Sequence, residues 1–445
     1  MWVFIKKCVT WLLGFVKWKK EQLKQILRKH IRWYDDRIVI ADARNKLMLE
    51  QHKKYRDVCG VIEYCRRTGQ PVMTVREKGM AYVSRPECFE GEKEAVFEYQ
   101  HPKIYLAELS DADVYGYSEL ITSGGTALSD AYMYDCKQKR YNIGGGSLAK
   151  HQTGKYILAT YNESGIVIEK AISLLGWRPD NYYHFTLEII SRLPFADEIE
   201  EYRNWPVLID ECVMRIPQLR DLTAGMNKLG HPIIEVKPRQ AVRVKRLLYI
   251  SYDMWMPHNY RAGAKQYPSD YLFSASVTSN IRKYLFEKYP IPEKPQNLRI
   301  FLSRKKCGNQ RLLNADKVEA FFAGKGFTII YPEELSFAEE VQLFQNACLI
   351  VGPTGAALTN LIYCRENTTV AIIAPESHRS YFFSNIAYLV KVRFLFLGAN
   401  IVEKGIAESM DTFELDMEKC ERFVNSDICN GLYNRPIRNG ENYDT

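Results

Sequence analysis

The stretch "NYYHFTLEIISRL" sets three side chains capable of acid–base or ionic chemistry four residues apart: His184, Glu188 and Arg192. On a helix these side chains share one face, and successive ones lie about 6 Å apart along the axis. A His or a carboxylate that its neighbours hold in place can act as a general base. The same spacing also fits a solvated stripe of salt bridges. The stretch therefore predicts a helix and leaves both roles open.

Three polar clusters in the second half of the chain each follow a predicted strand. "FLSR" ends in Ser303 and Arg304, and Arg311 lies in the next loop. "GPTGAALTN" follows the apolar "LIV", and "IIAPESH" places Glu376 after the strand Val370–Ala374. Ligands of parallel α/β sheets bind outside the carboxyl ends of the strands, so we expect the clusters to converge. Guanidiniums and a helix N-terminus favour phosphate, and a carboxylate can accept from ribose hydroxyls, which predicts a nucleotide diphosphate site.

Two other nucleotide-binding signatures are missing from the sequence. It contains no G-x-x-x-x-G-K-[ST], which disfavours a P-loop kinase or NTPase. It also contains no G-x-G-x-x-G after a strand, which disfavours a dinucleotide oxidoreductase.

The motif "DAD" at Asp111–Asp113 resembles the carboxylate pair with which many glycosyltransferases hold a divalent metal. It lies within a region of strand-like alternation, and we interpret it as a turn between strands. A metal-dependent transferase that uses Asp111 and Asp113 stays an alternative, and such an enzyme would lose all activity in chelator.

Alternating strands and helices must position these clusters. From residue 298 onward the short apolar strands are "LRIFLSR", "FTIIYP", "CLIVG" and "TTVAIIAP", with helices expected at about 314–323, about 336–345 and from Ala356. This alternation is typical of a parallel sheet covered on both faces, which predicts a Rossmann-like domain. Upstream, residues 181–240 show a strand–helix–strand pattern, and a helix is expected at about 269–289. The middle of residues 34–180 alternates like strands.

The net charge of +8 is concentrated at the N-terminus. Residues 1–33 contain nine Lys or Arg and one acidic residue, so residues 34–445 keep no excess positive charge for a nucleic acid. The apolar run between Lys7 and Lys17 is far shorter than the ~20 residues that span a bilayer. Apolar residues instead recur at helical spacing between basic ones. We expect a basic amphipathic helix on an anionic membrane surface, or alternatively a helix packed on the protein's own body.

Composition describes an ordinary folded protein. The hydrophobic content is 46% and the charged content 26%, and 445 residues are enough for two or three domains. The 11 cysteines include no C-x-x-C pair and no histidines at zinc spacing, so we expect reduced thiols in a cytosol and no metal site or cofactor.

The chain resembles glycosyltransferase family 61 over roughly residues 100–400. Four stretches carry the resemblance by their joint order and spacing: "YYHFTLEIISRL", "FLSRKKCGNQRLLNADKVEAFFAGKGF", "IIYPEELSFAEEVQLFQNACLIVGPTGAALTNLIYC" and "VAIIAPE". The resemblance implies a GT-B architecture, in which two Rossmann-like domains face a cleft and the C-terminal one holds the donor. It also implies inverting transfer without the metal-binding carboxylate motif of the other large glycosyltransferase fold.

The predicted donor site combines the strand-end clusters with this resemblance. Its residues are Arg304, Arg311, Asn314, Thr354, Gly355, Ala356, Asn360 and Glu376. The resemblance implies phosphate contacts for the two arginines and assigns the helix start to Gly355, Ala356 and Asn360. Two positions depart from the family, which usually has His-Gly-Ala at 354–356 and often Asn-Glu at 314–315, where this chain has Thr-Gly-Ala and Asn-Ala.

The predicted catalytic pair lies on the acceptor side. The resemblance implies that His184 and Glu188 face the cleft, and either one is a candidate base. Arg192 and His258 are the other acceptor-side residues that we predict, and Asp253 or His258 is the next candidate for the base.

We therefore predict an inverting, metal-independent transferase that moves a sugar from a nucleotide-sugar donor to a growing surface or capsular polysaccharide or a glycolipid. A non-catalytic nucleotide- or glycan-binding scaffold of the same fold is the alternative from another class. We expect it in the cytoplasm, peripheral on the inner face of the cell membrane. The predicted parts are a membrane-surface segment (1–33), an acceptor-side domain (34–240), a donor-binding domain (241–400) and a C-terminal extension that packs back on the N-terminal domain (401–445).

Overall fold

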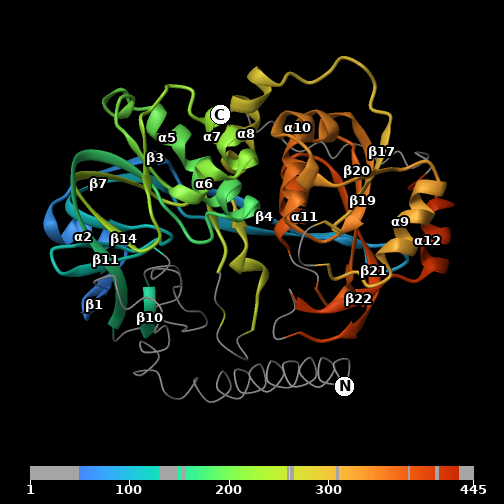
Figure 1. Ribbon diagram of the computed structural model, residues 1–445, viewed down its shortest axis with the longest axis horizontal. Helices are drawn as coiled ribbons and strands as arrows, with labels where there is room; N and C mark the ends of the chain where they lie inside the picture. Colours follow the sequence, from blue (N-terminus) through green and yellow to red (C-terminus); the bar gives the residue numbers. More distant parts are fainter. Residues whose placement is uncertain are drawn as a thin grey trace, which may run out of the picture. The chain divides into compact units, whose positions relative to one another are not determined.

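Two sheets, one mixed and one largely parallel, organise the chain in the computed structural model (Figure 1). The structure describes residues 50–130, 148–152, 156–257, 260, 265–306, 310–378, 381–405 and 410–429. Residues 1–33, for which the amphipathic helix is predicted, and His258 lie outside the described residues. The described residues from position 51 onward belong to the compact unit Gln51–Thr445.

The first sheet has a parallel core of four strands in the order β13–β12–β11–β14. Their bounds are β11 (Tyr156–Leu174), β12 (Val207–Asp210), β13 (Ile233–Val236) and β14 (Gln240–Ile250). An antiparallel strand, β7 (Ile104–Tyr115), pairs with β14 and extends the sheet. The remaining strands of this sheet are β1 (Glu50–Tyr55), β2 (Val58–Cys59), β3 (Val72–Arg76), β8 (Ile121–Ser123), β9 (Thr126–Leu128) and β10 (Leu148–Gln152).

The second sheet has five parallel strands in the order β18–β17–β19–β20–β21. Their bounds are β17 (Leu298–Leu302), β18 (Thr328–Ile330), β19 (Ala347–Pro353), β20 (Thr369–Pro375) and β21 (Arg393–Glu403). β19 and β20 are buried over almost their whole length, as the continuous apolar runs predict for a sheet covered on both faces. The predicted mixed α/β fold is therefore confirmed.

Helices cover both faces of the second sheet. One face packs on α10 (Phe337–Asn346), the 3₁₀ helix η7 (Ala356–Tyr363) and α11 (Tyr381–Leu389), and the other on α9 (Ala315–Gly324) and α12 (Met417–Val424). Alternate side chains of each strand point to opposite faces of the sheet. Ile300 and Leu302 therefore pack in the hydrophobic core on one face, and Phe301 packs in the core on the other. Three short 3₁₀ turns complete this half: η5 (Pro268–Asp270), η6 (Pro332–Glu334) and η8 (Glu376–His378).

The helices of the first half begin with a run from Tyr182 to Asp197. The run consists of α4 (Tyr182–His184), a π-helical turn η2 (Phe185–Ile189), a 3₁₀ turn η3 (Ile190–Arg192) and α5 (Leu193–Asp197). The others are α2 (Val61–Thr68), η4 (Glu200–Tyr202), α6 (Glu211–Arg215), α7 (Pro217–Met226) and α8 (Ala275–Lys288). One cluster of buried apolar side chains includes residues of both sheets and of α7, α8, α10 and η7, so the two sheets share a core.

Where a helix was expected at about 269–289, the structure has a shorter one. α8 begins at Ala275, with Ser274 as its N-cap, and the short strand β16 (Leu272–Phe273) precedes it and pairs with β15 (Met254–Trp255). The apolar pair Leu272–Phe273 is buried in this β-bridge, which the helical pattern alone did not separate from the helix.

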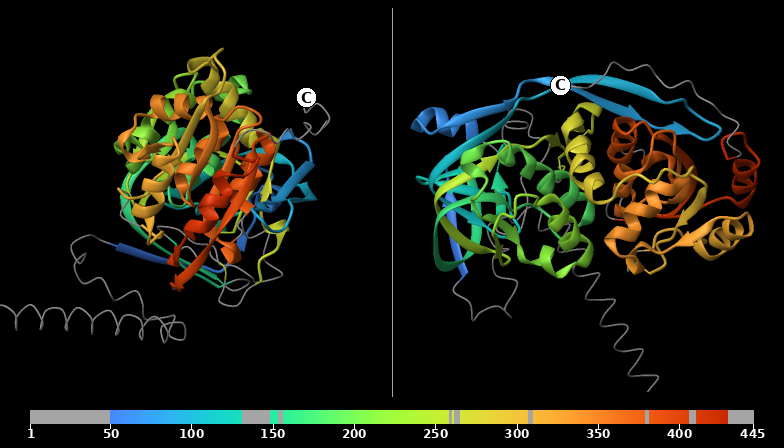
Figure 2. Two further views of the ribbon diagram at one scale, coloured as in Figure 1. Left: turned by 90° about the vertical axis from the view of Figure 1, so that its right-hand side faces the viewer. Right: turned by 90° about the horizontal axis from the view of Figure 1, so that it is seen from above.

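An early segment of the chain crosses to the second sheet (Figure 2). The hairpin of β4 (Gly79–Arg85) and β6 (Ala95–His101) packs on α11, and Ser84 exchanges hydrogen bonds with Asn385 and Ser384 of that helix. β5 (Glu87–Cys88) pairs in parallel with β21. The described end of the chain joins the same sheet, because β22 (Thr412–Glu414) pairs with β21.

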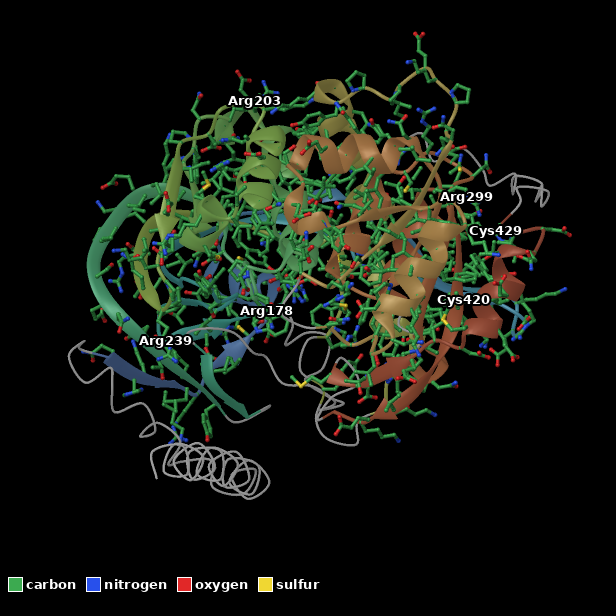
Figure 3. All side chains as sticks on the ribbon, turned by 45° about the vertical axis from the view of Figure 1, so that its right-hand side comes forward. Arg178, Arg203, Arg239, Arg299, Cys420 and Cys429 are labelled. Atoms are coloured by element: carbon green, nitrogen blue, oxygen red, sulfur yellow. The ribbon has the colours of Figure 1, made fainter. Side chains whose placement is uncertain are left out.

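The last described residues lie against the second sheet. Arg299 of β17 donates to the Cys429 thiol at 2.8 Å (Figure 3). The Phe423 ring of α12 meets Phe89 edge-on at 5.4 Å between centroids. The predicted domain boundaries stay predictions. Within the described residues, none of the helices combines the length and the apolar character that a bilayer-spanning segment requires.

Candidate active site

The predicted His–Glu pair forms at the start of the helical run. The His184 Nδ1 atom lies 2.9 Å from Glu188 Oε1, and the two side chains are 15% and 8% exposed. Arg192 is 2% exposed; its guanidinium donates to the carbonyls of Ile250 and Ile189 and lies over the Tyr252 ring. Because none of the three side chains is solvated, the alternative of a surface salt-bridge stripe is excluded.

A π-helical turn shapes this pair. The Ile190 N–H donates to the Phe185 carbonyl, five residues earlier, so one extra residue is accommodated in the helix directly after His184. Asn181 caps the run, and its side chain accepts from the backbone N–H groups of Tyr183 and His184. π-Helical turns occur often at functional sites, and this one carries Glu188.

The loop after β11 packs Trp177 against the pair. The Trp177 ring meets the His184 ring edge-on at 5.0 Å between centroids. Asp210, at the carboxyl end of β12, holds this loop by accepting from the N–H groups of Gly176 and Tyr117 at 3.2 and 2.6 Å. Burial raises the pKa of Asp210 to about 8. A Cβ on Gly176 would lie 2.5 Å from Ile189 Cδ1, so glycine allows the loop to approach the π turn.

A second carboxyl group, Asp253, lies behind the helical run. It follows β14 at the same sheet edge, is fully buried, and its Oδ1 accepts from Ser191 at 3.3 Å. Its Oδ2 makes no hydrogen bond to the described residues. Burial raises the pKa of Asp253 to about 7, opposed by the charge of Arg192. Asp253 is therefore a buried proton-binding group at the carboxyl edge of the first sheet.

The raised pKa of Asp253 predicts how stability depends on pH. In the unfolded chain this carboxyl titrates near its ordinary pKa of about 3.9. Between that pH and about 7 only the folded state keeps the proton, so the free energy of unfolding falls as the pH rises. Asp253→Asn removes the titration, and the stability of the variant relative to the wild type should improve from pH 5 to pH 8. Denaturant unfolding of both proteins at each pH checks this, and an equal difference at both pH values contradicts it.

Two arginines meet at the carboxyl end of β19. Arg304 Nη1 and Arg311 Nη2 donate to the Thr354 carbonyl at 2.9 and 3.2 Å. A Cβ on Gly355 would lie 1.8 Å from Arg304 Nη1, so only glycine leaves room for this guanidinium. Gly355 has an extended backbone, with φ of 177°, and its role is close approach rather than an unusual conformation. η7 begins at the next residue, Ala356, and its first N–H groups lie at this turn between β19 and η7.

The other predicted donor-site residues occupy different places. Asn314 exchanges two hydrogen bonds with the backbone of Leu415, which ties the start of α9 to the C-terminal segment. Asn360 is fully buried and contacts Glu340 and Tyr182. Glu376 begins η8 directly after β20. The strand ends thus bring together Arg304, Arg311, Thr354, Gly355 and Ala356, while the side chains of Asn314 and Asn360 are engaged elsewhere.

Sequence reasoning missed a His–Asp pair at the end of β20. His378 Nε2 lies 2.8 Å from Asp411 Oδ2; Asp411 is buried and His378 is partly buried. Asp411 also accepts from the Gly405 N–H at 2.6 Å. The position of His378 two residues after Glu376 was a usable signal, but its partner lies 33 residues away and no local pattern connects them.

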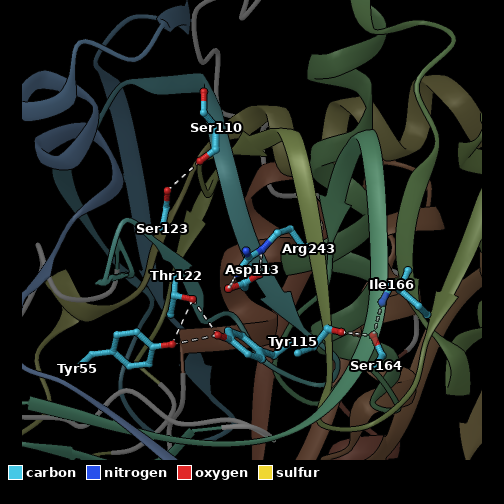
Figure 4. Close-up of polar contacts among 10 residues, drawn as sticks. Tyr55, Ser110, Asp113, Tyr115, Thr122, Ser123, Ser164, Ile166 and Arg243 are labelled. Atoms are coloured by element: carbon cyan, nitrogen blue, oxygen red, sulfur yellow. Dashed lines mark hydrogen bonds and ion pairs between the residues drawn. The ribbon is translucent and has the colours of Figure 1, made fainter.

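Asp111 and Asp113 lie inside β7 and not in a turn, so that expectation was wrong. Asp113 is held by a two-point ion pair, in which Arg243 of β14 donates Nε and Nη2 to its two oxygens at 2.7 and 2.8 Å (Figure 4). The cross-strand arginine satisfies the carboxylate and lets it occupy a strand. In the described ranges, no three His, Cys, Asp or Glu residues are grouped as metal ligands.

The comparison with known families matches a part of the chain that includes both groups of residues. Residues 182–371 match the family described as glycosyltransferase 61. The matched range begins with the helix of His184 and Glu188 and includes Arg304, Arg311 and Gly355. No curated protein matches the chain. Enzymes of this kind act on a sugar donor and a glycan acceptor. The chain carries a glycosyltransferase family 61 domain over residues 182–371 and is therefore a glycosyltransferase.

Proposed function

We propose that the enzyme is an inverting, metal-independent glycosyltransferase of GT-B architecture. Its donor is a nucleotide sugar, and its acceptor is a growing surface or capsular polysaccharide or a glycolipid. One observation carries the proposal: the parallel strands of each sheet present one half of the required chemistry at their carboxyl edge. The first sheet carries the His184–Glu188 pair and the second carries Arg304, Arg311 and Gly355. Ligands of such sheets bind at these edges.

His184 is the proposed base, and Glu188 orients it. A carboxylate at Nδ1 favours the tautomer with its proton on that nitrogen, which makes Nε2 the basic nitrogen. Nε2 removes the proton of the acceptor hydroxyl as its oxygen attacks the anomeric carbon, and the Glu188 carboxylate stabilises the imidazolium that forms. A single displacement of this kind inverts the configuration at the sugar.

Arg304 and Arg311 are the proposed partners of the leaving nucleotide diphosphate. The Thr354 carbonyl accepts from both guanidiniums and so holds two positive charges at one corner. A guanidinium carries five N–H donors in a planar fork, and this fork and the N–H groups at the start of η7 suit phosphate oxygens. Preplaced positive charge of this kind stabilises the developing charge, which supports transfer without a metal.

A ligand screen followed by an activity assay tests the proposal. A nucleoside diphosphate present at 100 times its dissociation constant should stabilise the protein by about 2.7 kcal/mol, which thermal shift detects. The best nucleotide then identifies sugar donors for a hydrolysis assay without acceptor, run with and without chelator. Turnover that survives chelator supports the proposal. Complete loss in chelator supports a metal-dependent transferase, and no response to any nucleotide sugar refutes the donor class.

We also propose that residues 1–33 hold the enzyme on the inner face of the cell membrane, in the cytoplasm. Their nine Lys and Arg residues favour an anionic surface, each contributing about 1 kcal/mol, and the Trp and Phe residues add apolar burial.

Vesicle binding of the full-length protein is expected to rise with anionic lipid and to fall with added salt, which screens the charges. Deletion of residues 1–33 should release the protein into the soluble fraction and leave transfer to a short soluble acceptor largely unchanged. Co-sedimentation measures both effects. Vesicle binding that does not change with lipid charge or salt contradicts the proposal. It is also contradicted if deletion of residues 1–33 lowers thermal stability without changing vesicle binding.

A further inference from the structure

A hydrogen-bonded chain of three side chains connects the helix of the catalytic pair to the helix of the donor site. The Tyr182 hydroxyl donates to Asn360 Oδ1 at 2.6 Å. Asn360 Nδ2 donates in turn to Glu340 Oε2 at 2.7 Å. Asn360 is completely buried and Glu340 is 4% exposed, so water does not replace these partners.

The donor and the acceptor of each of these two hydrogen bonds are fixed. A phenol hydroxyl that donates to the amide oxygen leaves the amide nitrogen to donate to Glu340, so the Asn360 side chain has one orientation. Burial raises the pKa of Glu340 to about 7, opposed by the bond from Asn360. Breaking a hydrogen bond to a buried carboxyl costs free energy, so the bond from Asn360 to Glu340 is expected to persist.

The hydrogen-bonded series Tyr182–Asn360–Glu340 joins the two sheets at the site itself. Tyr182 is the first residue of α4, two positions before His184. Asn360 lies in η7, whose first residue directly follows Gly355. Glu340 lies in α10, which packs beside η7 on the second sheet. The bond between Tyr182 and Asn360 therefore fixes where the proposed base stands relative to the proposed phosphate contacts.

We propose that Tyr182, Asn360 and Glu340 are positioning residues that set the catalytic pair in register with the donor site. Both polar atoms of the Asn360 side chain are used in this chain, so its role is to connect the two helices and not to contact the donor. The inference rests on the proposed function, because it takes His184 as the base and the corner at Gly355 as the donor site.

Loss of the connection should lower kcat and spare donor binding. A displacement of about 1 Å between reacting groups can cost about a hundredfold in rate. The proposed donor contacts all follow strands of the second sheet, so they keep their positions relative to one another when α4 shifts. We expect Tyr182→Phe to lower kcat by roughly tenfold to a hundredfold and to change the donor KM by less than about twofold.

Tyr363→Phe is the matched control for Tyr182→Phe. The Tyr363 hydroxyl lies 3.3 Å from that of Tyr182, but Tyr363 belongs to η7, and its loss leaves the bond between Tyr182 and Asn360 in place. The control should keep near-normal kcat. Equal kcat values in the two variants would overturn the positioning role.

A hydrogen-bond reversal provides the second test. Asn360→Asp places a carboxylate against Glu340 and should lower both kcat and thermal stability, because two buried carboxylates repel. In the double variant with Glu340→Gln, the new amide donates to the introduced carboxylate and the charge count is restored. This carboxylate still accepts from Tyr182, so the double variant should regain most of the wild-type kcat. Glu340→Gln alone should lower kcat less than Asn360→Asp does, since its amide oxygen still accepts from Asn360.

The outcomes separate this inference from the proposed function. A wild-type protein that turns over no nucleotide sugar contradicts the proposed function. Wild-type turnover with a normal Tyr182→Phe variant contradicts the positioning role alone. A double variant that regains thermal stability but not kcat also overturns the positioning role, because restoring the bond would then serve only the fold.

Discussion

Glu188→Gln is expected to lower kcat by about 10²–10⁴ while the donor still binds. The amide is close to the carboxylate in size, so the π turn should keep its packing. Two things change at His184. The amide nitrogen can donate to Nδ1, which moves the ring proton to Nε2 and blocks the base, and the negative charge that stabilises the imidazolium is lost. His184→Asn should cause a loss of similar size, because it removes the base itself.

Steady-state kinetics with saturating donor and acceptor measures this effect. Glu198→Gln is the matched control, since Glu198 directly follows α5 at the end of the same helical run but is exposed and paired with Arg76. The control should retain normal turnover. Near-normal turnover in both Glu188→Gln and His184→Asn would place the base elsewhere, and the buried Asp253 would become the first alternative.

The parts of the fold that depend on local pattern could be predicted from the sequence. Continuous apolar strands such as β19 and β20 indicate a sheet covered on both faces, and the four-residue spacing of His184 and Glu188 brings them into contact. The convergence of Arg304 and Arg311 follows from strand order, because the carboxyl ends of parallel strands share one edge.

Contacts between distant residues could not be predicted in this way. Asn360 was expected at the donor because of its place after Gly355, but its partner Tyr182 lies 178 residues away. Asp113 was assigned to a turn between two strands, whereas Arg243, 130 residues later, satisfies it within a sheet. In both cases the residue contacts a partner that is distant in the sequence, and no sequence spacing predicts that partner.

The turn after β19 illustrates the same limit. In the sequence, "GPTGAALTN" predicted a helix N-terminus that favours phosphate. The structure places the protein's own Arg304 guanidinium against Gly355, and Leu302 of β17 against Gly352. Gly352 therefore allows β17 and β19 to lie close together, and Gly355 makes room for the cation that is proposed to bind the phosphate.

Arg304→Ala is expected to weaken nucleoside diphosphate binding by roughly tenfold to a hundredfold. The loss of one charge-assisted contact costs about 1.5–3 kcal/mol. The fold should survive, because Arg311 still donates to the Thr354 carbonyl and leaves no buried acceptor unsatisfied. Titration calorimetry with the nucleotide selected by thermal shift measures the change. Arg422→Ala, which removes an exposed arginine of α12 that pairs with Glu90, should bind normally.

Gly355→Ala gives a stricter form of this test. The added methyl group would lie 1.8 Å from Arg304 Nη1, so it should displace the guanidinium and weaken binding by about as much as Arg304→Ala. The extended backbone at Gly355 accepts alanine without strain, so steric conflict with the arginine is the main effect. In a protein that already carries Arg304→Ala, the same Gly355→Ala change should cost almost nothing. Additive losses in the double variant would show that Gly355 and Arg304 act on the nucleotide separately, and normal binding by Arg304→Ala would remove the arginine from the donor site.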